Sequence, residues 1–453
     1  MKKLTTLLFA IVFSAGIAFG QDSNDAVIEQ SGDDLQANIT QTGDDNTAGI
    51  FQGSADERGP TLSVGTSEDN EATIEQVGDD NTAEILQGLD GGDADDNRAR
   101  IEQEGDDNAA RIEQGADDGG TASGNSNARI TQKGDDNFAE IEQGENSGGA
   151  EDNTATIDQT GDDNIADIEQ GDDNGSSSDG NTARIDQEGD DNEAAIRQGD
   201  GDSGISESSD NVARIEQTAD DNSANINQGT DGGDASDNRA MVEQSGDDNE
   251  ADILQGVDGD ADDNTARVEQ SGGNNDAIVR QGVDDGSEAN DNRAAVDQSG
   301  DDNAADINQG YIDGTANGNR ATVEQSGEDN WAMISQGTEG GDASDNVGRV
   351  TQSGDDNFAE IDQGVLGGIA NDNRAIIEQS GEDNEALIEQ GNDANTSAAD
   401  NLAEIFQDGD DNLGEIFQLG DDNVALIDQN GDDDTATINQ DGQENDATIT
   451  QNN

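Results

Sequence analysis

The stretch ARIEQEGDDNAARIEQG, residues 99–115, contains the phrase Ala-Arg-Ile-Glu-Gln twice, separated by the segment EGDDNA. The same unit, Asn-x-Ala-x-Ile-x-Gln, occurs first at 24–30 and last at 445–451, and we count 32 such arms. Gln closes every arm, and Ile or Val fills the fifth position of every arm. The few exceptions fall at the Ala position, at Gly348 and Gly414, and at the Asn position, at Leu35, Ser126 and Asp434. Such regular recurrence indicates a repeat architecture.

The fixed residues of an arm alternate with variable ones, which is the period of a β-strand. One face of an arm therefore carries the fixed residues and the other carries mostly charged ones. The four residues between arms, x-Gly-Asp-Asp, predict a tight turn, because Gly and Asp tolerate the backbone conformations that turns need. We expect the fixed residues to form an inward stacking ladder, exemplified by Asn97, Ala99, Ile101, Gln103, Asn108, Ala110, Ile112, Gln114, Gln217, Gln244, Gln325 and Gln336.

The composition alone is typical of disorder, with 28% hydrophobic residues, 2% aromatic residues and a net charge of -91. The strict register of the apolar residues outweighs that indication. We therefore predict an all-β fold: a β-solenoid, or cross-β stack, of strand-turn-strand repeats. Two arms form each of about 16 coils, first arms stack on first arms, and the coils lie about 4.8 Å apart.

The spacing between the closing glutamines alternates between 11 residues within a pair and usually 15 to 19 between pairs. The longer connections are rich in Gly, Asp, Ser and Asn, and we expect them to be insertions along one edge of the stack. Residues 53–69 form the longest loop, whereas residues 401–453 are compact repeats without long loops. Residues 21–453 are thus expected to form one repeat solenoid.

Stacked Gly-Asp-Asp turns place carboxylates in rows, where neighbouring charges repel by roughly 0.9 kcal/mol per pair even in water. Salt must offset this cost, and it does so most strongly near molar concentrations. We expect no cofactor and no specific metal site, but non-specific Na⁺, K⁺ or Ca²⁺ at the Asp-rich turns. Specific Ca²⁺ sites remain an alternative, since hard cations prefer oxygen ligands.

The two arms of a pair differ on their outward faces, because arginine is concentrated on first arms. Second arms carry outward hydrophobic residues, and we interpret these as incidental, with lateral bundling through this face as the alternative. The first-arm arginines are residues 98, 100, 129, 184, 214, 239, 267, 293, 320, 349 and 374, and the second-arm arginines are 111, 197 and 280. The outward hydrophobic residues are Phe138, Ile165, Trp331, Phe358 and Leu413.

Residues 1–20 are expected to be a secretory signal peptide, because Lys2 and Lys3 precede a short apolar run. Cleavage is expected between Gly20 and Gln21. No later segment is apolar enough for membrane insertion of the mature chain, and the absence of cysteine excludes disulfides and thiolate metal sites. The mature chain is therefore expected to be secreted.

The combined motif Gln-x-Gly-x-x-Asn-x-Ala-x-Ile-x-Gln, present at 103–114 and 325–336, resembles the curlin repeat. The resemblance covers essentially the whole mature chain. It implies a subunit of a secreted, curli-like functional amyloid of bacterial biofilms. It also implies an outer-membrane secretion channel and a nucleator subunit as partners. This chain differs from the usual pattern in its many repeats, long acidic loops and charge.

We expect an extracellular, cell-surface fibre that self-assembles head to tail as a homopolymer for biofilm matrix and surface adhesion. The expected polymerisation edges are Asn24, Ala26, Ile28, Gln30, Asn445, Ala447, Ile449 and Gln451, because neither end shows a capping repeat. The alternative is a monomeric acidic β-solenoid adhesin or a cation-binding surface coat protein. An enzyme is not expected without His or Cys, and nucleic acid would be repelled by the net charge.

Overall fold

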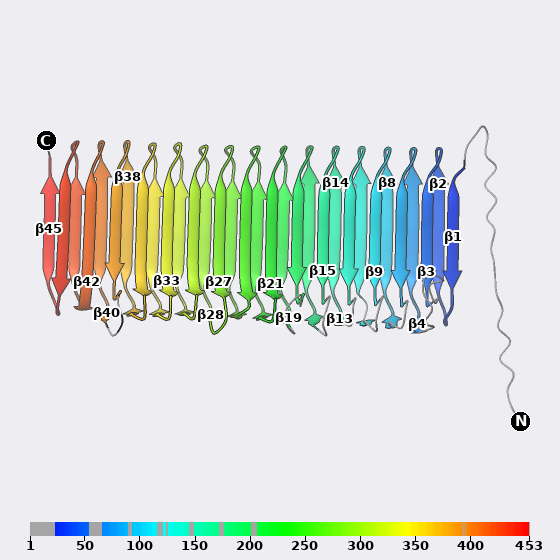
Figure 1. Cartoon of the computed structure of the whole chain (residues 1–453), viewed down its shortest axis with the longest axis horizontal. Coiled ribbons are helices and arrows are strands. Elements are labelled where there is room, and N and C mark those ends of the chain that lie inside the picture. The colour runs from blue at the N-terminus through cyan, green and yellow to red at the C-terminus, as the bar shows by residue number, and fades with distance from the viewer. Residues whose placement is uncertain are drawn as a thin grey trace, which may run out of the picture.

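The computed structural model describes residues 23–53, 66–88, 93–115, 121–123, 126–144, 149–171, 176–200, 206–392, 394 and 396–452. These residues form an all-β solenoid of parallel strands and contain no helix, so none that could cross a membrane. Figure 1 shows the coils following one another along the long axis, from β1 at one end to β45 at the other. The expected signal peptide, its cleavage site and most of the loop 53–69 lie outside the described residues.

First arms form a parallel, 16-stranded sheet, here called the first-arm sheet. Its strands are β2 (Gln36–Thr42), β5 (Glu71–Val77), β8 (Arg98–Glu104), β11 (Asn127–Lys133), β14 (Thr154–Thr160), β17 (Thr182–Glu188), β20 (Val212–Gln217), β23 (Arg239–Gln244), β26 (Thr265–Gln270), β29 (Arg293–Gln298), β32 (Arg320–Gln325), β35 (Val347–Gln352), β38 (Arg374–Ser380), β41 (Leu402–Asp408), β43 (Val424–Gln429) and β45 (Asp446–Gln451).

Second arms form the facing sheet, here called the second-arm sheet. Its strands are β1 (Asp25–Gln30), β3 (Thr47–Gln52), β6 (Thr82–Gln87), β9 (Ala109–Gln114), β12 (Phe138–Gln143), β15 (Ile165–Gln170), β18 (Glu193–Gln198), β21 (Ser223–Thr230), β24 (Glu250–Val257), β27 (Asp276–Val283), β30 (Ala304–Tyr311), β33 (Trp331–Thr338), β36 (Phe358–Val365), β39 (Glu385–Gln390), β42 (Leu413–Asp421) and β44 (Thr435–Asp441).

The strand register aligns identical positions of successive arms. Within the first-arm sheet, Ala128 lies beside Ala99 and Ile130 beside Ile101. The alternation of the arm therefore places the Ala of its third position and the Ile or Val of its fifth position between the two sheets. These residues form one continuous core in which Ile101 has no exposed surface. A thin core suffices, because each coil packs against the coils on either side.

The longer connections contain a third set of short strands, which the sequence interpretation treated as plain loop insertions. We call these strands and their connecting segments the foot. Their bounds are β4 (Thr66–Glu68), β7 (Asp93–Asp95), β10 (Thr121–Ser123), β13 (Gly149–Glu151), β16 (Ser177–Asp179), β19 (Glu207–Ser209), β22 (Asp234–Ser236), β25 (Asp260–Asp262), β28 (Glu288–Asn290), β31 (Thr315–Asn317), β34 (Asp342–Ser344), β37 (Ile369–Asn371) and β40 (Ser397–Ala399). They join the second-arm sheet through β42 into one 29-stranded sheet.

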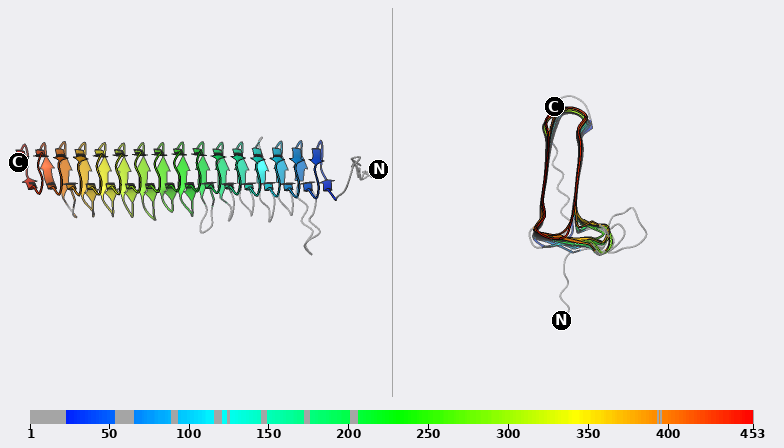
Figure 2. Two further views of the ribbon diagram at one scale, coloured as in Figure 1. Left: turned by 90° about the horizontal axis from the view of Figure 1, so that it is seen from above. Right: turned by 90° about the vertical axis from the view of Figure 1, so that its left-hand side faces the viewer.

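Viewed along its axis, the solenoid has two long sides joined by short turns at one narrow end and by the foot at the other (Figure 2). The foot projects beside the outer face of the second-arm sheet. Where β30 leads into the foot, the ring of its last residue, Tyr311, lies under the guanidinium of Arg280, with Arg280 Cζ 5.3 Å from the ring centroid. Asn392 Nδ2 donates to Asp362 Oδ2 at 3.4 Å, which links the segment after β39 to the preceding second arm, β36. Among the described residues, no comparable projection lies beside the outer face of the first-arm sheet.

Candidate functional site

The glutamine that closes each arm points into the solenoid and bonds to its copy in the next coil. Gln103 Nε2 donates to Gln132 Oε1 at 2.9 Å and to the carbonyl of Thr82 in the facing sheet at 3.0 Å. Gln217 Nε2 donates to Gln244 Oε1 at 3.0 Å. Equivalent bonds join Gln114 to Gln143, Gln325 to Gln352 and Gln336 to Gln363. Buried amides are costly when unpaired, so these ladders stabilise the stack.

The asparagine that opens each arm is buried in nearly all coils, and its hydrogen bonds to its copies run in the opposite direction to those of the glutamines. Asn108 donates from its backbone nitrogen and from Nδ2 to Asn81 Oδ1, at 3.1 and 3.0 Å. Asn108 Nδ2 also donates to the turn carbonyl of Gly134 at 2.7 Å. In the first-arm sheet, Asn97 donates from its backbone nitrogen to Asn70 Oδ1 at 2.8 Å. Asparagine thus fixes each arm to its flanking turns as well as to its copies.

The Gly-Asp-Asp turns form a second hydrogen-bonded row at the narrow edge of the solenoid. Gly105 has φ of 132°, and a Cβ there would lie 2.0 Å from Gly134 O, so only glycine fits. Asp107 adopts a left-handed conformation with φ of 56°. The backbone nitrogen of Asp106 donates to Asp135 Oδ1 at 2.8 Å. One aspartate of each turn therefore accepts a bond from the neighbouring coil.

Stacking of the turns brings the second aspartate of each turn close to its copies in the neighbouring coils, where the negative charges repel. The pKa of Asp107 is raised above its usual value by desolvation and by the charges of Asp136 and Asp80 in the neighbouring coils. The pKa values of Asp163 and Asp221 are raised for the same two reasons. These exposed carboxylates repel one another along the whole edge, which cations in solution would screen.

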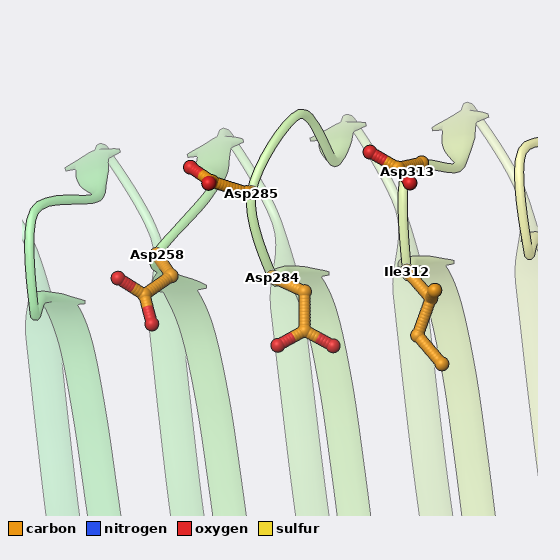
Figure 3. A pocket seen from close by; sticks show the side chains of 5 residues that line it. All are labelled: Asp258, Asp284, Asp285, Ile312 and Asp313. Carbon is orange, nitrogen blue, oxygen red and sulfur yellow. The ribbon is translucent and has the colours of Figure 1, made fainter.

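A shallow hollow of about 380 Å³ lies on the foot, where three second arms turn into it (Figure 3). Its lining residues are Asp258, Asp284, Asp285, Ile312 and Asp313. The pKa of Asp258 is raised by desolvation and by nearby aspartates. Within the described ranges, no group of three or more Asp or Glu residues has the arrangement of a metal site.

The outer face of the first-arm sheet is a mixed-charge surface in which mid-strand arginines pair with acids of neighbouring strands. Arg349 Nη2 lies 3.0 Å from Glu324 Oε2, and Arg267 Nη2 lies 2.9 Å from Glu243 Oε2. These side chains are all about one third or more exposed, so each pair contributes little to stability.

The outer face of the second-arm sheet is acidic and carries the large apolar side chains. Trp331 and Phe358 stack on adjacent strands, with ring centroids 4.5 Å apart and planes inclined by 13°. Phe138 and Ile165, also adjacent in register, are 41% and 46% exposed. Leu413 is half-buried. The two broad faces of the solenoid therefore differ in charge and in apolar content.

The outermost described strands leave core positions open to solvent. Ile28 on β1 is 40% exposed, whereas the equivalent Ile50 on the next strand of that sheet has no exposure. Ala447 and Ile449 on β45 are only partly buried against the core. The remaining predicted edge residues lie on or next to these two strands: Asn24, Ala26, Gln30, Asn445 and Gln451.

The foot strands have a sequence signal that the interpretation above missed. Most contain an alanine three residues before the asparagine that opens the next first arm, as Ala94 precedes Asn97 and Ala235 precedes Asn238. Both alanines are completely buried. Asn238 Nδ2 donates to the carbonyl of Ala261 in the next foot strand at 2.7 Å. The recurrent Ala-x-x-Asn spacing could therefore have predicted a third stacked strand.

Parts of this regular stack match a known family of repeats. Residues 68–95, 398–431 and 420–452 match the family model of the curlin associated repeat. These three regions of the chain carry curlin repeats. The curlin-repeat family is structural and non-enzymatic. No curated protein matches this curlin-repeat chain.

Proposed function

We propose that the mature chain, residues 21–453, is a structural subunit of an extracellular, curli-like amyloid fibre that contributes to biofilm matrix and surface adhesion. The association of curlin repeats with extracellular curli fibres supports this proposal. Export follows removal of the signal peptide, and the partners are further copies of the chain, a nucleator subunit and an outer-membrane secretion channel.

The outermost described strands have unpaired outer edges, and these edges support the proposal. Among the described strands, β1 pairs along its length only with β3, and β45 pairs only with β43, so each has one unpaired edge. Each outer edge presents backbone donors and acceptors together with half-exposed core side chains. Edges of this kind favour pairing with another chain.

The two ends match each other in order as well as in chemistry. At one end the outermost strands are β1 of the second-arm sheet and β2 of the first-arm sheet; at the other they are β44 and β45, respectively. A second copy placed on top would therefore continue each sheet, with its β1 on β44 and its β2 on β45. Such a contact is heterologous and repeats indefinitely as a filament.

In each glutamine ladder, the side chain donates to the glutamine of the following coil, so the two ends of a ladder differ. Gln440 Nε2 donates to Val424 O but to no further described glutamine, while Gln30 donates to Gln52 and offers its Oε1 outward. In the proposed junction, Gln440 would donate to Gln30 of the next copy. Gln451 would likewise donate to Gln41 of that copy. The ladders would then run unbroken from subunit to subunit.

The proposal includes about 16 coils per subunit, each built from two arms, which the 16-stranded first-arm sheet supports. It also includes cations without specific sites, Na⁺, K⁺ or Ca²⁺, held near the acid rows of the turns. The subunit needs no cofactor and catalyses no reaction.

Elongation kinetics test the junction directly. In the variant A447D/I449D, two carboxylates occupy core positions of β45, where a second copy would have to bury them. The matched control, T448D/T450D, adds the same charge to the opposite face of the same strand. Seeded growth, followed by thioflavin fluorescence and electron microscopy in about 1 M salt, should slow at least tenfold in the first variant and at most threefold in the control.

Equal slowing of both variants would show that charge, and not the core contact, limits growth. A parent chain that stays monomeric at high concentration and in multimolar salt would support the alternative, a monomeric adhesin or surface coat protein.

A further inference from the structure

Four arginines on the first-arm sheet lack the ion pairs that the other arginines of that face make. Arg239, Arg293, Arg320 and Arg374 hold the first outward position of β23, β29, β32 and β38, and all four are exposed. None of them forms an ion pair with another residue that the structure describes. In contrast, Arg349 in the middle of β35 lies 3.0 Å from Glu324 Oε2.

The strand register places these four side chains in one line, here called the arginine row. Arg293 lies directly beside Arg320, and single uncharged residues separate the pair from Arg239 and from Arg374. Neighbouring strands are about 4.8 Å apart, and like charges directly opposite each other are unfavourable. Nothing within the described part of the chain pairs with the row.

The opposite face of the same coils has an excess of acid. Between β24 and β39, the second-arm sheet carries the outward carboxyls of Asp252, Asp276, Asp306, Glu360 and Asp362 but only one outward arginine, Arg280. Arg280 is already engaged with Asp306 at 2.9 Å. The pKa values of all five carboxyls are raised, foremost by desolvation. The composition of this face makes it opposite in charge to the arginine row wherever the carboxyls are ionised, and a nearby guanidinium favours the ionised form.

The two faces also match in spacing and shape. Both sheets belong to one solenoid, so their strands repeat at the same interval along the axis. When two copies lie parallel, the arginine row can face the carboxyls that share one line on the other copy. These are Asp252, Asp306 and Glu360, on every second strand, while Asp276 and Asp362 lie in the lines on either side. The flat first-arm face of one copy can then lie against the second-arm face of its neighbour, above the projecting foot (Figure 2).

We infer that the first-arm face docks on the second-arm face of a second copy, with the arginine row donating to the carboxylates of that face. This contact is lateral and uses the broad faces, so it is distinct from the head-to-tail junction of the proposed function. Because the two surfaces differ, the association can continue sideways from copy to copy. Its product is a ribbon of solenoids.

Trp331 makes the contact measurable, because it is the one tryptophan of the chain and lies on the second-arm face. Docking would cover it and shift its emission to shorter wavelength. The test uses the full mature chain with A447D/I449D, so that lateral association is measured without elongation. Sedimentation velocity and Trp331 emission are recorded against protein concentration in about 0.5 M salt.

The decisive variant, R239Q/R293Q/R320Q/R374Q, should weaken lateral association at least tenfold and abolish the emission shift. The control, R100Q/R184Q/R267Q/R349Q, removes four paired arginines from the same face and should weaken association at most threefold. Circular dichroism checks that both variants fold.

Equal weakening by both variants would overturn the inference. No lateral association of the parent between 0.1 and about 2 M salt would also overturn it. The third contrary outcome is that the row binds a sulfated polysaccharide and has no effect on self-association. If lateral association survives while the parent never elongates, the docking stands and the head-to-tail proposal fails.

Discussion

Gln217 Nε2 donates to Gln244 Oε1 at 3.0 Å and, from the same nitrogen, to the carbonyl of Glu193 at 3.0 Å. The first bond joins two coils within the first-arm sheet, and the second joins that sheet to the second-arm sheet. One side chain thus connects the stack both along and across its axis. This double role explains why glutamine closes every arm.

Replacing a ladder glutamine should destabilise the stack far more than replacing its outward neighbour. Q217A and Q244A each leave buried partners unpaired, and we expect a loss of about 1–3 kcal/mol. E216A and E243A remove partly exposed ion-pair partners and should cost about 0.5 kcal/mol or less. Chemical denaturation of the four variants measures the difference. Similar midpoints for all four would mean that the inward amides do not hold the coils together.

Alanine substitutions at Gly105 and Gly340 distinguish the cost of a steric clash from the cost of backbone strain alone. Gly105 and Gly340 both have positive φ, but a Cβ at Gly105 would clash with Gly134 O, whereas a Cβ at Gly340 meets nothing within 4 Å. G340A should therefore cost only the strain of about 1–2 kcal/mol. G105A should cost clearly more and lower the thermal midpoint further. A smaller loss for G105A than for G340A would contradict the close stacking of the turns.

Asp362 predicts a pH dependence of stability. Burial, together with Glu360 and Glu389, raises its pKa to about 7, whereas an unfolded carboxyl titrates near about 3.9. Between these values the folded chain holds a proton that the unfolded chain has released, so stability falls as the pH rises from about 4 to 7. D362N should remove this loss.

The variant D362N should accordingly be more stable than the parent by about 1–3 kcal/mol at pH 8 and nearly equal to it at pH 4. Urea denaturation at both pH values measures this. The control is D297N, which removes one charge at an exposed aspartate. Its change in stability should differ less between the two pH values. A D362N gain that is larger at pH 4 would contradict the sign.

Folding itself should depend on salt, because the acid rows oppose the stacking that the repeats require. Far-UV circular dichroism of the mature chain should show β-structure increasing from about 0.01 M to above 1 M NaCl, as the screening length falls from about 30 to 3 Å. Ca²⁺ at equal ionic strength tests whether its effect exceeds simple screening. A spectrum that stays disordered under all these conditions would refute the fold.

The arms and their stacking could be predicted from the sequence, because the inward positions of the repeat are all constrained. Strand alternation requires Ala99 and Ile101 to face inward, and the buried amides Asn97 and Gln103 have partners only if copies stack. The arms, their parallel stacking and the tight turns follow from these constraints. The apolar residues of the arms thus specify the core almost completely.

The foot could not be predicted in the same way, because its strands are only three residues long and bury one small residue each, an alanine such as Ala94 in most of them. Their pairing depends on the neighbouring coil, which already holds Asn97 in place. The hydrogen bond from the Asp106 backbone nitrogen to Asp135 Oδ1 could not be predicted either, because it joins two neighbouring coils. A row of aspartates indicates only repulsion until the backbone donor beside each carboxylate is known.

In the proposed fibre, copies continue one another's sheets, and a cryo-electron microscopy reconstruction of fibres grown from residues 21–453 would resolve the junction between them. We predict β1 of each copy paired in parallel with β44 of the copy before it, β2 paired with β45, and a subunit repeat of about 75–80 Å along the axis, from 16 strands about 4.8 Å apart. A fibre in which other strands form the junction, or particles that remain single solenoids, would contradict the account.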